Sequence, residues 1–264
     1  MTKAGILSVE PMSGKTTLME LLAGVFTISQ GRTAALFSTG DMTDFEMSVE
    51  LNNKTAATEP DIVRATIETT PGDPMLLDYG ARVGVENVYL YNVVGAEMEE
   101  YDKIDFLKKA IKAIPVDLTL VEITGDLTSE INQAIIKELD CSLLLVHPSW
   151  KSIENSKKIL NILPKCSATA NMMMVSSMID PKNIGDKKMA TLLGVKQENL
   201  LRYPKVDLLQ KESLTGHLDV CCGKIVTGTP PYDTLRQPMQ EIMQYLFDNI
   251  NYSVIKPINK WFGA

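Results

Sequence analysis

Short, uniformly apolar segments alternate along the chain with longer segments of helical periodicity. Strands are expected near residues 4–9, 33–38, 88–94, 118–123, 142–147, 171–176 and 200–202, and helices near 14–26, 101–113, 128–138, 151–162, 187–193 and 234–249. Apolar strands without alternation are buried on both faces, as in a central parallel sheet. The pattern therefore predicts an α/β fold: a mostly parallel sheet of about six to eight strands with helices on both faces.

The domain organisation follows from what the sequence lacks. It contains no repeat, low-complexity tract or long Gly/Ser linker, so one domain is expected over residues 1–250, followed by a C-terminal tail, 251–264. Residues 41–80 are expected to be helical with interruptions at Pro60 and at 71–74. No apolar run reaches the ~20 residues that span a bilayer, and the first residues lack the order of a signal peptide. A cytoplasmic protein is expected.

Charge and cysteine content limit the class of protein further. Residues 1–150 carry 11 basic and 23 acidic residues, a net charge of −12, whereas residues 151–264 carry 15 and 10, a net charge of +5. The acidic half argues against a broad nucleic-acid-binding face, so DNA is a less expected partner. The four cysteines have no metal-binding spacing, which indicates reduced, packed thiols.

The strongest chemical signal is the segment 9–17, which reads VEPMSGKTT between the first strand and the first helix. A strand, a short loop and Gly-Lys-Thr opening a helix is the context of a phosphate-binding loop. Backbone N–H groups and the helix N-terminus attract the anion, Lys15 reaches the β- and γ-phosphates, and the Thr16 hydroxyl binds Mg²⁺. The other interpretation is a purely structural helix start. Val9 replaces the usual first glycine, and Pro11 lacks an N–H donor.

The expected nucleotide-binding residues are Met12, Ser13, Gly14, Lys15, Thr16 and Thr17. Two acidic residues complete the candidate catalytic set with Lys15. Glu122 ends an apolar strand and is expected to hold Mg²⁺ together with Thr16, unless it is a strand-end residue that faces solvent; Asp126 is a second candidate. Asp41 follows the second strand, where it either orients water or metal or caps the next helix.

These elements, in this order, resemble the MinD/ParA branch of P-loop ATPases, including pilus-localising proteins of the TadZ/CpaE type. The segments 37–44, 118–125, 143–149, 173–177 and 202–207 fit the same pattern. The resemblance implies the P-loop NTPase fold, ATP and Mg²⁺ as cofactors, and Gly125 as a sensor of the γ-phosphate. It also implies a slow ATPase switch that forms a homodimer with ATP and positions a pilus, secretion, partition or membrane complex through a protein partner.

One departure from the family pattern keeps a second hypothesis open. Glu10 stands where the family has a lysine that reaches the nucleotide of the dimer partner, so either Glu10 turns away or that mechanism is lost. A non-hydrolysing scaffold with a P-loop fold is the alternative function. The tail resembles the membrane-targeting tail of MinD and predicts a peripheral membrane contact, unless Trp261 and Phe262 dock it on the domain.

Overall fold

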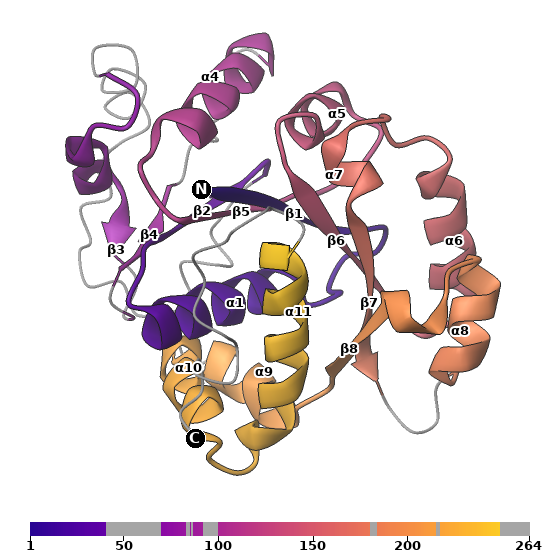
Figure 1. Cartoon of the computed structure of the whole chain (residues 1–264). Coiled ribbons are helices and arrows are strands. Elements are labelled where there is room, and N and C mark those ends of the chain that lie inside the picture. Colours follow the sequence, from indigo (N-terminus) through magenta and orange to yellow (C-terminus); the bar gives the residue numbers. More distant parts are fainter. Residues whose placement is uncertain are drawn as a thin grey trace.

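The computed structural model describes residues 1–40, 70–82, 85, 87–91, 100–179, 184–214 and 217–248. Its centre is an eight-stranded sheet in the order β3-β4-β2-β5-β1-β6-β7-β8 (Figure 1). The strands are β1 (Thr2–Ser8), β2 (Ala34–Ser38), β3 (Ala81–Arg82), β4 (Val88–Leu90), β5 (Leu118–Glu122), β6 (Cys141–Val146), β7 (Met172–Ile179) and β8 (Leu200–Pro204). All neighbours pair in parallel except β3 with β4. The predicted α/β class is confirmed.

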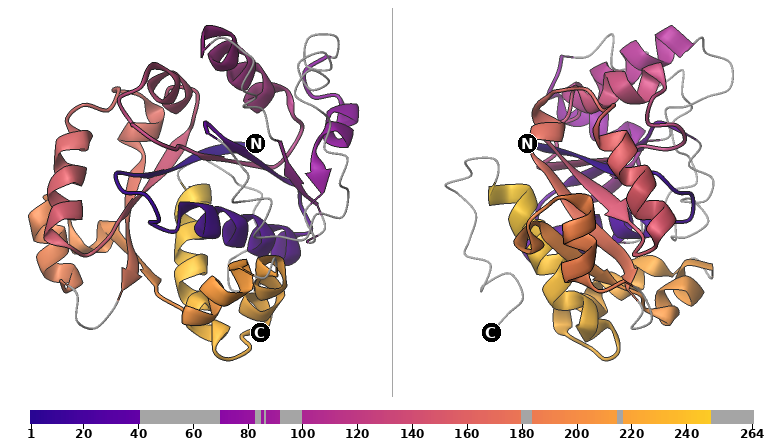
Figure 2. Two further views of the ribbon diagram at one scale, coloured as in Figure 1. Left: turned by 180° about the vertical axis from the view of Figure 1, so that it is seen from behind. Right: turned by 90° about the vertical axis from the view of Figure 1, so that its right-hand side faces the viewer.

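Helices cover both faces of this sheet (Figures 1 and 2). One face carries α1 (Lys15–Gln30), α9 (Asp207–Leu214), α10 (Leu218–Thr227) and α11 (Arg236–Asp248). The other carries α4 (Glu100–Ala113), α5 (Glu130–Ile136), α6 (Trp150–Leu160), α7 (Ser167–Ala170) and α8 (Asp186–Leu193). Three 3₁₀ segments, η1 (Pro74–Tyr79), η2 (Gln197–Asn199) and η3 (Tyr232–Leu235), lie in the connections. Each face has its own hydrophobic core.

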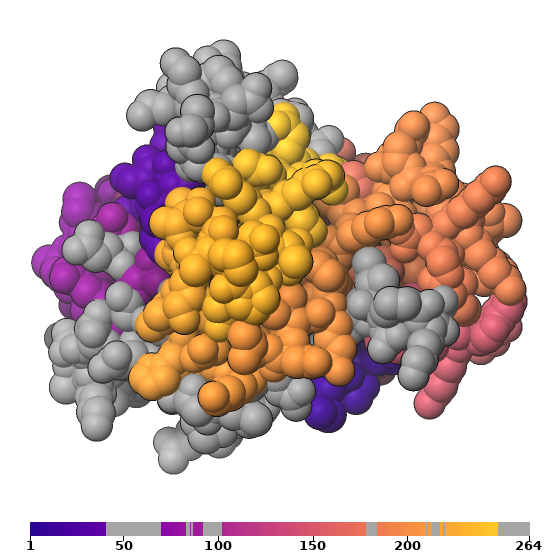
Figure 3. Space-filling model, turned by 90° about the horizontal axis from the view of Figure 1, so that it is seen from below, coloured from indigo at the N-terminus to yellow at the C-terminus, as the bar shows by residue number. Residues whose placement is uncertain are grey.

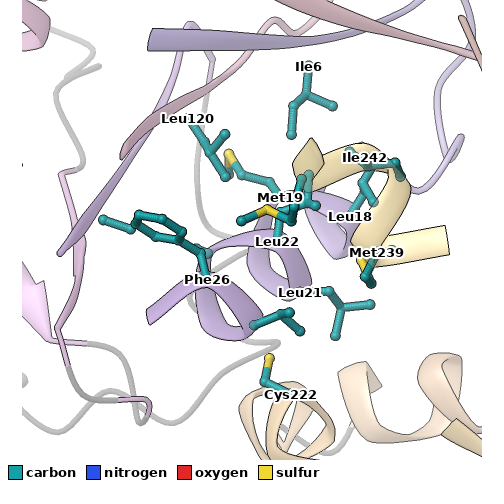
Figure 4. Packing of buried hydrophobic residues seen from close by; sticks show 14 of the residues in the cluster. Ile6, Leu18, Met19, Leu21, Leu22, Phe26, Leu120, Cys222, Met239 and Ile242 are labelled. Carbon is teal, nitrogen blue, oxygen red and sulfur yellow. The ribbon is translucent and has the colours of Figure 1, made fainter. Parts of the chain in front are cut away.

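Helix α1 is buried between the sheet and the C-terminal helices. Every residue from 18 to 27 is buried. In Figure 4, Leu18 and Met19 lie between Ile6 of β1 and Met239 of α11. Seen from below, α11 and the orange helices before it form the outer surface of this layer (Figure 3). Burying a leucine side chain contributes about 1.5–3 kcal/mol, so α1 is a fixed support for the loop that precedes it.

The sequence missed the antiparallel edge strand β3 and the short helices α7, α9 and α10. It also placed the start of the last helix at residue 234, whereas η3 runs to Leu235 and α11 begins at Arg236. Helix α10 contains a central Gly223, and its place is set by packing on α1, which a local pattern does not show. The predicted elements in 41–69 and the tail 251–264 lie outside the described residues. Among the described helices, none has the length and apolarity needed to cross a membrane.

Candidate functional site

The sheet order brings the first loop and Glu122 to the same edge. Strand β5 lies between β1 and β2 and pairs with β1 in a register that sets Ile6 opposite Glu122. The N–H of Ile123 donates to the Ile6 carbonyl over 3.0 Å. Because these strands are parallel, their carboxyl ends and the loops that follow lie together, where ligands bind in open α/β sheets.

The loop between β1 and α1 has an unusual backbone. Met12 has a φ of +54° and Gly14 a φ of +85°, both in the left-handed region, while Ser13 between them does not have a positive φ. Such alternation turns successive N–H groups toward one side and forms an anion-binding concavity. Glycine adopts this region freely, but a methionine is strained there. The Met12 side chain is 93% exposed, so no packing contact accounts for the strain.

The polar groups of this loop are left without partners. Among the described residues, no oxygen accepts a hydrogen bond from the backbone N–H groups of Met12, Ser13, Gly14, Lys15, Thr16 and Thr17. Helix α1 has no side-chain cap at Gly14, and the buried hydroxyl of Ser13 also lacks a partner in the described part of the chain. Unpaired N–H groups at a helix start carry partial positive charge. The arrangement suits an anion such as phosphate.

Thr16 and Glu122 meet directly. The Thr16 hydroxyl donates to the Glu122 carboxylate and lies 3.0 Å from each of its oxygens. Glu122 is only 7% exposed, so the alternative in which it faces solvent is wrong. The 106 residues between the two positions show that the sheet, not local sequence, creates this pair.

Lys15 balances the negative charge of this buried group. Burial holds the pKa of the Lys15 ammonium below its usual value, and the Glu122 carboxylate acts in the opposite direction. An ammonium that has lost part of its hydration gains from a nearby anion, which restores the favourable interaction that water supplied. Lys15 is therefore set to bind a negatively charged ligand.

The oxygens of Thr16 and Glu122 fit Mg²⁺, which prefers hard oxygen donors and is commonly held by one or two protein oxygens together with substrate phosphates. Within the described ranges, no group of three or more His, Cys, Asp or Glu side chains could hold a metal on its own. A cation at this position therefore needs oxygens from the bound ligand. The other acidic candidates differ: Asp41 lies outside the described residues, and Asp126 accepts hydrogen bonds from Thr128 in its own turn.

Two polar residues at this edge, Thr39 and Asn132, were given no role from the sequence. Thr39, after β2, accepts a hydrogen bond from the Thr124 N–H over 3.0 Å. Asn132, on α5, donates to the Thr124 and Asp126 carbonyls. Asn132 is 2% exposed. A polar side chain at a buried position of a helix needs a hydrogen-bond partner, and this was the one local sign that Asn132 holds the neighbouring loop.

Two residues in or next to the late strands of the sheet, within the segments 143–149 and 202–207 that fit the family pattern, have structural partners. The His147 N–H donates to Ser152 at the start of α6, and Arg202 of β8 forms an ion pair with Asp186. Ser176 and Ser177 of β7 are buried. These contacts hold β6 to α6 and β8 to α8, whereas the hydroxyls of Ser176 and Ser177 have no hydrogen-bond partner among the described residues.

Comparison with known proteins finds structural matches alone: no protein-family model and no curated protein sequence matches this chain. A ParA family ATPase from Chlorobium tepidum TLS superposes with a TM-score of 0.70 at 15% identity, covering 93% of this chain and 97% of that one. The septum site-determining protein MinD from Pyrococcus horikoshii OT3, complexed with Mg-ADP, gives 0.70 at 14% identity, covering 95% and 99%. MinD in the MinC:MinD cell division complex of Aquifex aeolicus gives 0.68 at 16% identity, covering 92% and 96%.

Identities this low establish architecture and leave activity open. The matches extend over nearly the whole of both chains, which means that the order of strands and helices is shared and not only a common core. The chain has the P-loop NTPase fold of the MinD/ParA ATPases.

Proposed function

We propose that this protein binds ATP with Mg²⁺ in the loop between β1 and α1. The observation that carries the proposal is the run of backbone N–H groups from Met12 to Thr17 that have no partner among the described residues, next to the half-buried Lys15. Leaving so many donors unpaired costs free energy unless an anion binds them. The MinD of the Mg-ADP complex, which shares this fold, supports a nucleotide as that anion.

Each residue of the site has a distinct part in binding. The amides from 12 to 17 surround the phosphates, and Lys15 neutralises the β- and γ-phosphate charge. Thr16 and Glu122 hold Mg²⁺, which supplies further neutralisation of the triphosphate when bound. Asp41, which follows β2 in the sequence, orients the water for hydrolysis in this proposal.

The broader role is that of a slow ATPase switch. ATP shifts the population from monomer to homodimer, and the dimer positions a pilus, secretion, partition or membrane complex through a protein partner, as TadZ/CpaE-type proteins do. The structural match to MinD in a complex with MinC supports a protein partner in general terms. Glu10 places a negative charge beside the loop, which supports slow hydrolysis. In this role the protein is cytoplasmic, with peripheral membrane contact through residues 251–264.

One observation favours the second candidate, a non-hydrolysing scaffold. The Glu122 carboxylate already accepts the Thr16 hydroxyl with both oxygens. The Thr16 oxygen keeps its lone pairs for Mg²⁺ while its hydrogen is donated, but this hydrogen bond competes with direct coordination of the metal by the Glu122 oxygens, which weakens the metal site. Bound nucleotide without phosphate release would support the scaffold.

The test is a titration of the purified protein with ATP and Mg²⁺. Lys15→Ala is expected to weaken binding about 100-fold, because it removes a charged hydrogen-bond donor from the phosphates. Lys137→Ala, at an exposed position beyond α5, is the matched control and is expected to bind as the unchanged protein does. Equal affinities for the unchanged protein and Lys15→Ala would refute the proposal. Size-exclusion chromatography with and without ATP, with phosphate release measured on the same sample, then distinguishes the two functions. The ATPase switch is expected to dimerise with ATP and release phosphate, and the scaffold to bind nucleotide without releasing phosphate.

A further inference from the structure

The loop that follows β5 is held by hydrogen bonds on two sides. On the β2 side, the Thr124 N–H donates to the Thr39 hydroxyl over 3.0 Å. Gly40 lies so close that a Cβ built on it would come 3.1 Å from the Cβ of Thr124. On the α5 side, the Asn132 side-chain amide donates to the Thr124 carbonyl over 2.7 Å and to the Asp126 carbonyl over 2.8 Å. The loop is thus fixed between β2 and α5.

Only an amide nitrogen can make both contacts of Asn132. Each acceptor is a carbonyl oxygen, and an NH₂ group supplies two donors. The side chain is 2% exposed, so water does not compete with either bond. Asn132 also lies in the first turn of α5, which begins after the Ser129 cap. Its position is therefore set by the helix start as well as by burial.

The two carbonyls held by Asn132 belong to the residues on either side of Gly125, which has a φ of +70°. The Thr124 carbonyl and the Gly125 N–H belong to one planar trans peptide, in which C=O and N–H point in opposite directions. Holding the carbonyl toward Asn132 therefore directs the Gly125 N–H away from α5. The Asp126 carbonyl lies in the peptide after Asp126 and also accepts the Ser129 N–H over 3.0 Å, so the chain is fixed shortly after Gly125 as well.

We infer that Asn132 is a positioning residue: it fixes the direction of the Gly125 N–H, and so lets the site distinguish a nucleoside triphosphate from a diphosphate. This inference rests on the proposed nucleotide binding and adds a residue of α5 to the site. Asn132 itself contacts no phosphate. It acts through the orientation of one peptide group, which can donate a hydrogen bond only to a terminal phosphate on the side away from α5.

The test compares Asn132→Asp with Gln133→Glu. Gln133 is the next residue of α5 and donates to the Leu127 carbonyl over 3.0 Å, outside the peptides that flank Gly125. Both variants replace an amide by a carboxylate and add one negative charge on the same helix. The measured quantity is the ratio of Kd for ADP·Mg²⁺ to Kd for a non-hydrolysable ATP analogue with Mg²⁺. Asn132→Asp is expected to lower this ratio about tenfold, which corresponds to the loss of one hydrogen bond to a charged group. Its Kd for ADP·Mg²⁺ is expected to stay within about threefold of the value for the unchanged protein. Gln133→Glu is expected to leave the ratio unchanged.

A second measurement in the absence of nucleotide tests the hydrogen bonds themselves. Amide hydrogen exchange over 124–128 is expected to accelerate in Asn132→Asp and to remain slow in Gln133→Glu, with the exchange of β1 and β6 unaltered if the fold is intact. A ratio that falls equally in both variants, or stays the same in Asn132→Asp despite faster exchange, overturns the inference while nucleotide binding stands. Unaltered exchange in Asn132→Asp overturns it as well. A protein that binds neither nucleotide refutes the proposed function, and the inference with it.

Discussion

The two loops that form the site are built in opposite ways. The loop from 9 to 14 leaves the N–H groups of residues 12 to 14 unpaired among the described residues and contains a strained, exposed Met12. The loop from 123 to 129 is tied by Thr39 and Asn132 on either side of Gly125. One region has unsatisfied donors, and the other has a fixed backbone. A site built from both loops combines unpaired donors that attract an anion with a backbone that is held in one position. The two loops should therefore respond differently to ligand and to mutation.

The largest expected effect is stabilisation by ligand. ADP·Mg²⁺ at 100 times its Kd should stabilise the fold by about 2.7 kcal/mol, which raises Tm by roughly 5–10 °C for a chain of this size. Because the donors from Met12 to Thr17 are unpaired, the gain in hydrogen-exchange protection should concentrate there. Residues 124–128, already tied, should gain little. Lys15→Ala is the control and should reduce the stabilisation to about 0.4 kcal/mol at the same ligand concentration, because its binding is about 100-fold weaker. Protection gained mainly at 124–128 would contradict the contrast between the loops.

The second effect concerns the support of the first loop. A Cβ on Gly24 of α1 would come 3.0 Å from the Cβ of Cys222 on α10 and still closer to its sulfur. Gly24→Ala should therefore destabilise the protein by about 1–3 kcal/mol in urea unfolding, as overpacking does. Gly223→Ala on α10 is the matched control, because nothing lies within 4 Å of its Cβ. Alanine is the better helix former, so this change should stabilise by up to about 1 kcal/mol.

The third effect separates metal from nucleotide. Glu122→Gln keeps an oxygen for the Thr16 hydroxyl and removes the negative charge. Binding of ADP·Mg²⁺ should weaken about tenfold, consistent with the loss of one charged interaction. Binding of ADP in excess EDTA should stay equal or tighten, because a carboxylate no longer repels the phosphates. Calorimetry under both conditions measures this difference, and an equal loss in both would show that Glu122 does not act through the metal.

The fourth effect isolates backbone strain. A side chain in the left-handed region costs about 1–2 kcal/mol, and glycine loses about 0.5–1 kcal/mol more on folding. Met12→Gly should thus raise the free energy of unfolding by about 0.5–1 kcal/mol. Met12→Ala retains the Cβ and should give no gain. If Met12→Ala stabilises as much as Met12→Gly, the exposed side chain and not the backbone is responsible.

Much of the architecture followed from the sequence because its signals are local. Uniformly apolar strands such as 118–122 and 142–146 predicted a central parallel sheet, and Gly14 before Lys15 predicted a loop at the start of a helix. The meeting of Thr16 with Glu122 was also expected, since the ends of parallel strands share one edge. These expectations needed only the fold class.

The features that were not predicted depend on contacts between distant segments. The left-handed φ of Met12 has no local cause, because methionine does not favour that region. Asn132 stands in a helix and gives no sign of the carbonyls that it contacts. Helix α10 is short and contains Gly223, so packing on α1 and not propensity explains it. These features depend on contacts between residues that are far apart in the sequence, and no local sequence pattern indicates such contacts.

The smallest effect lies in the tied loop itself and is a shift of one pKa. The Asp126 carboxylate accepts hydrogen bonds from the Thr128 N–H and, second in importance, from the Thr128 hydroxyl, and these hold its pKa below 3.8. A lowered pKa in the folded state adds stability above the ordinary value and loses it as pH falls through the lowered one. Titration of the carboxyl by carbon NMR should show the low pKa. Thr128→Val, which removes the hydroxyl and keeps the N–H, should raise the Asp126 pKa part of the way back. A full return would mean that the backbone bond is not formed in solution, and the loop after β5 would then be held by its bonds to Thr39, Asn132 and Gln133 without this turn.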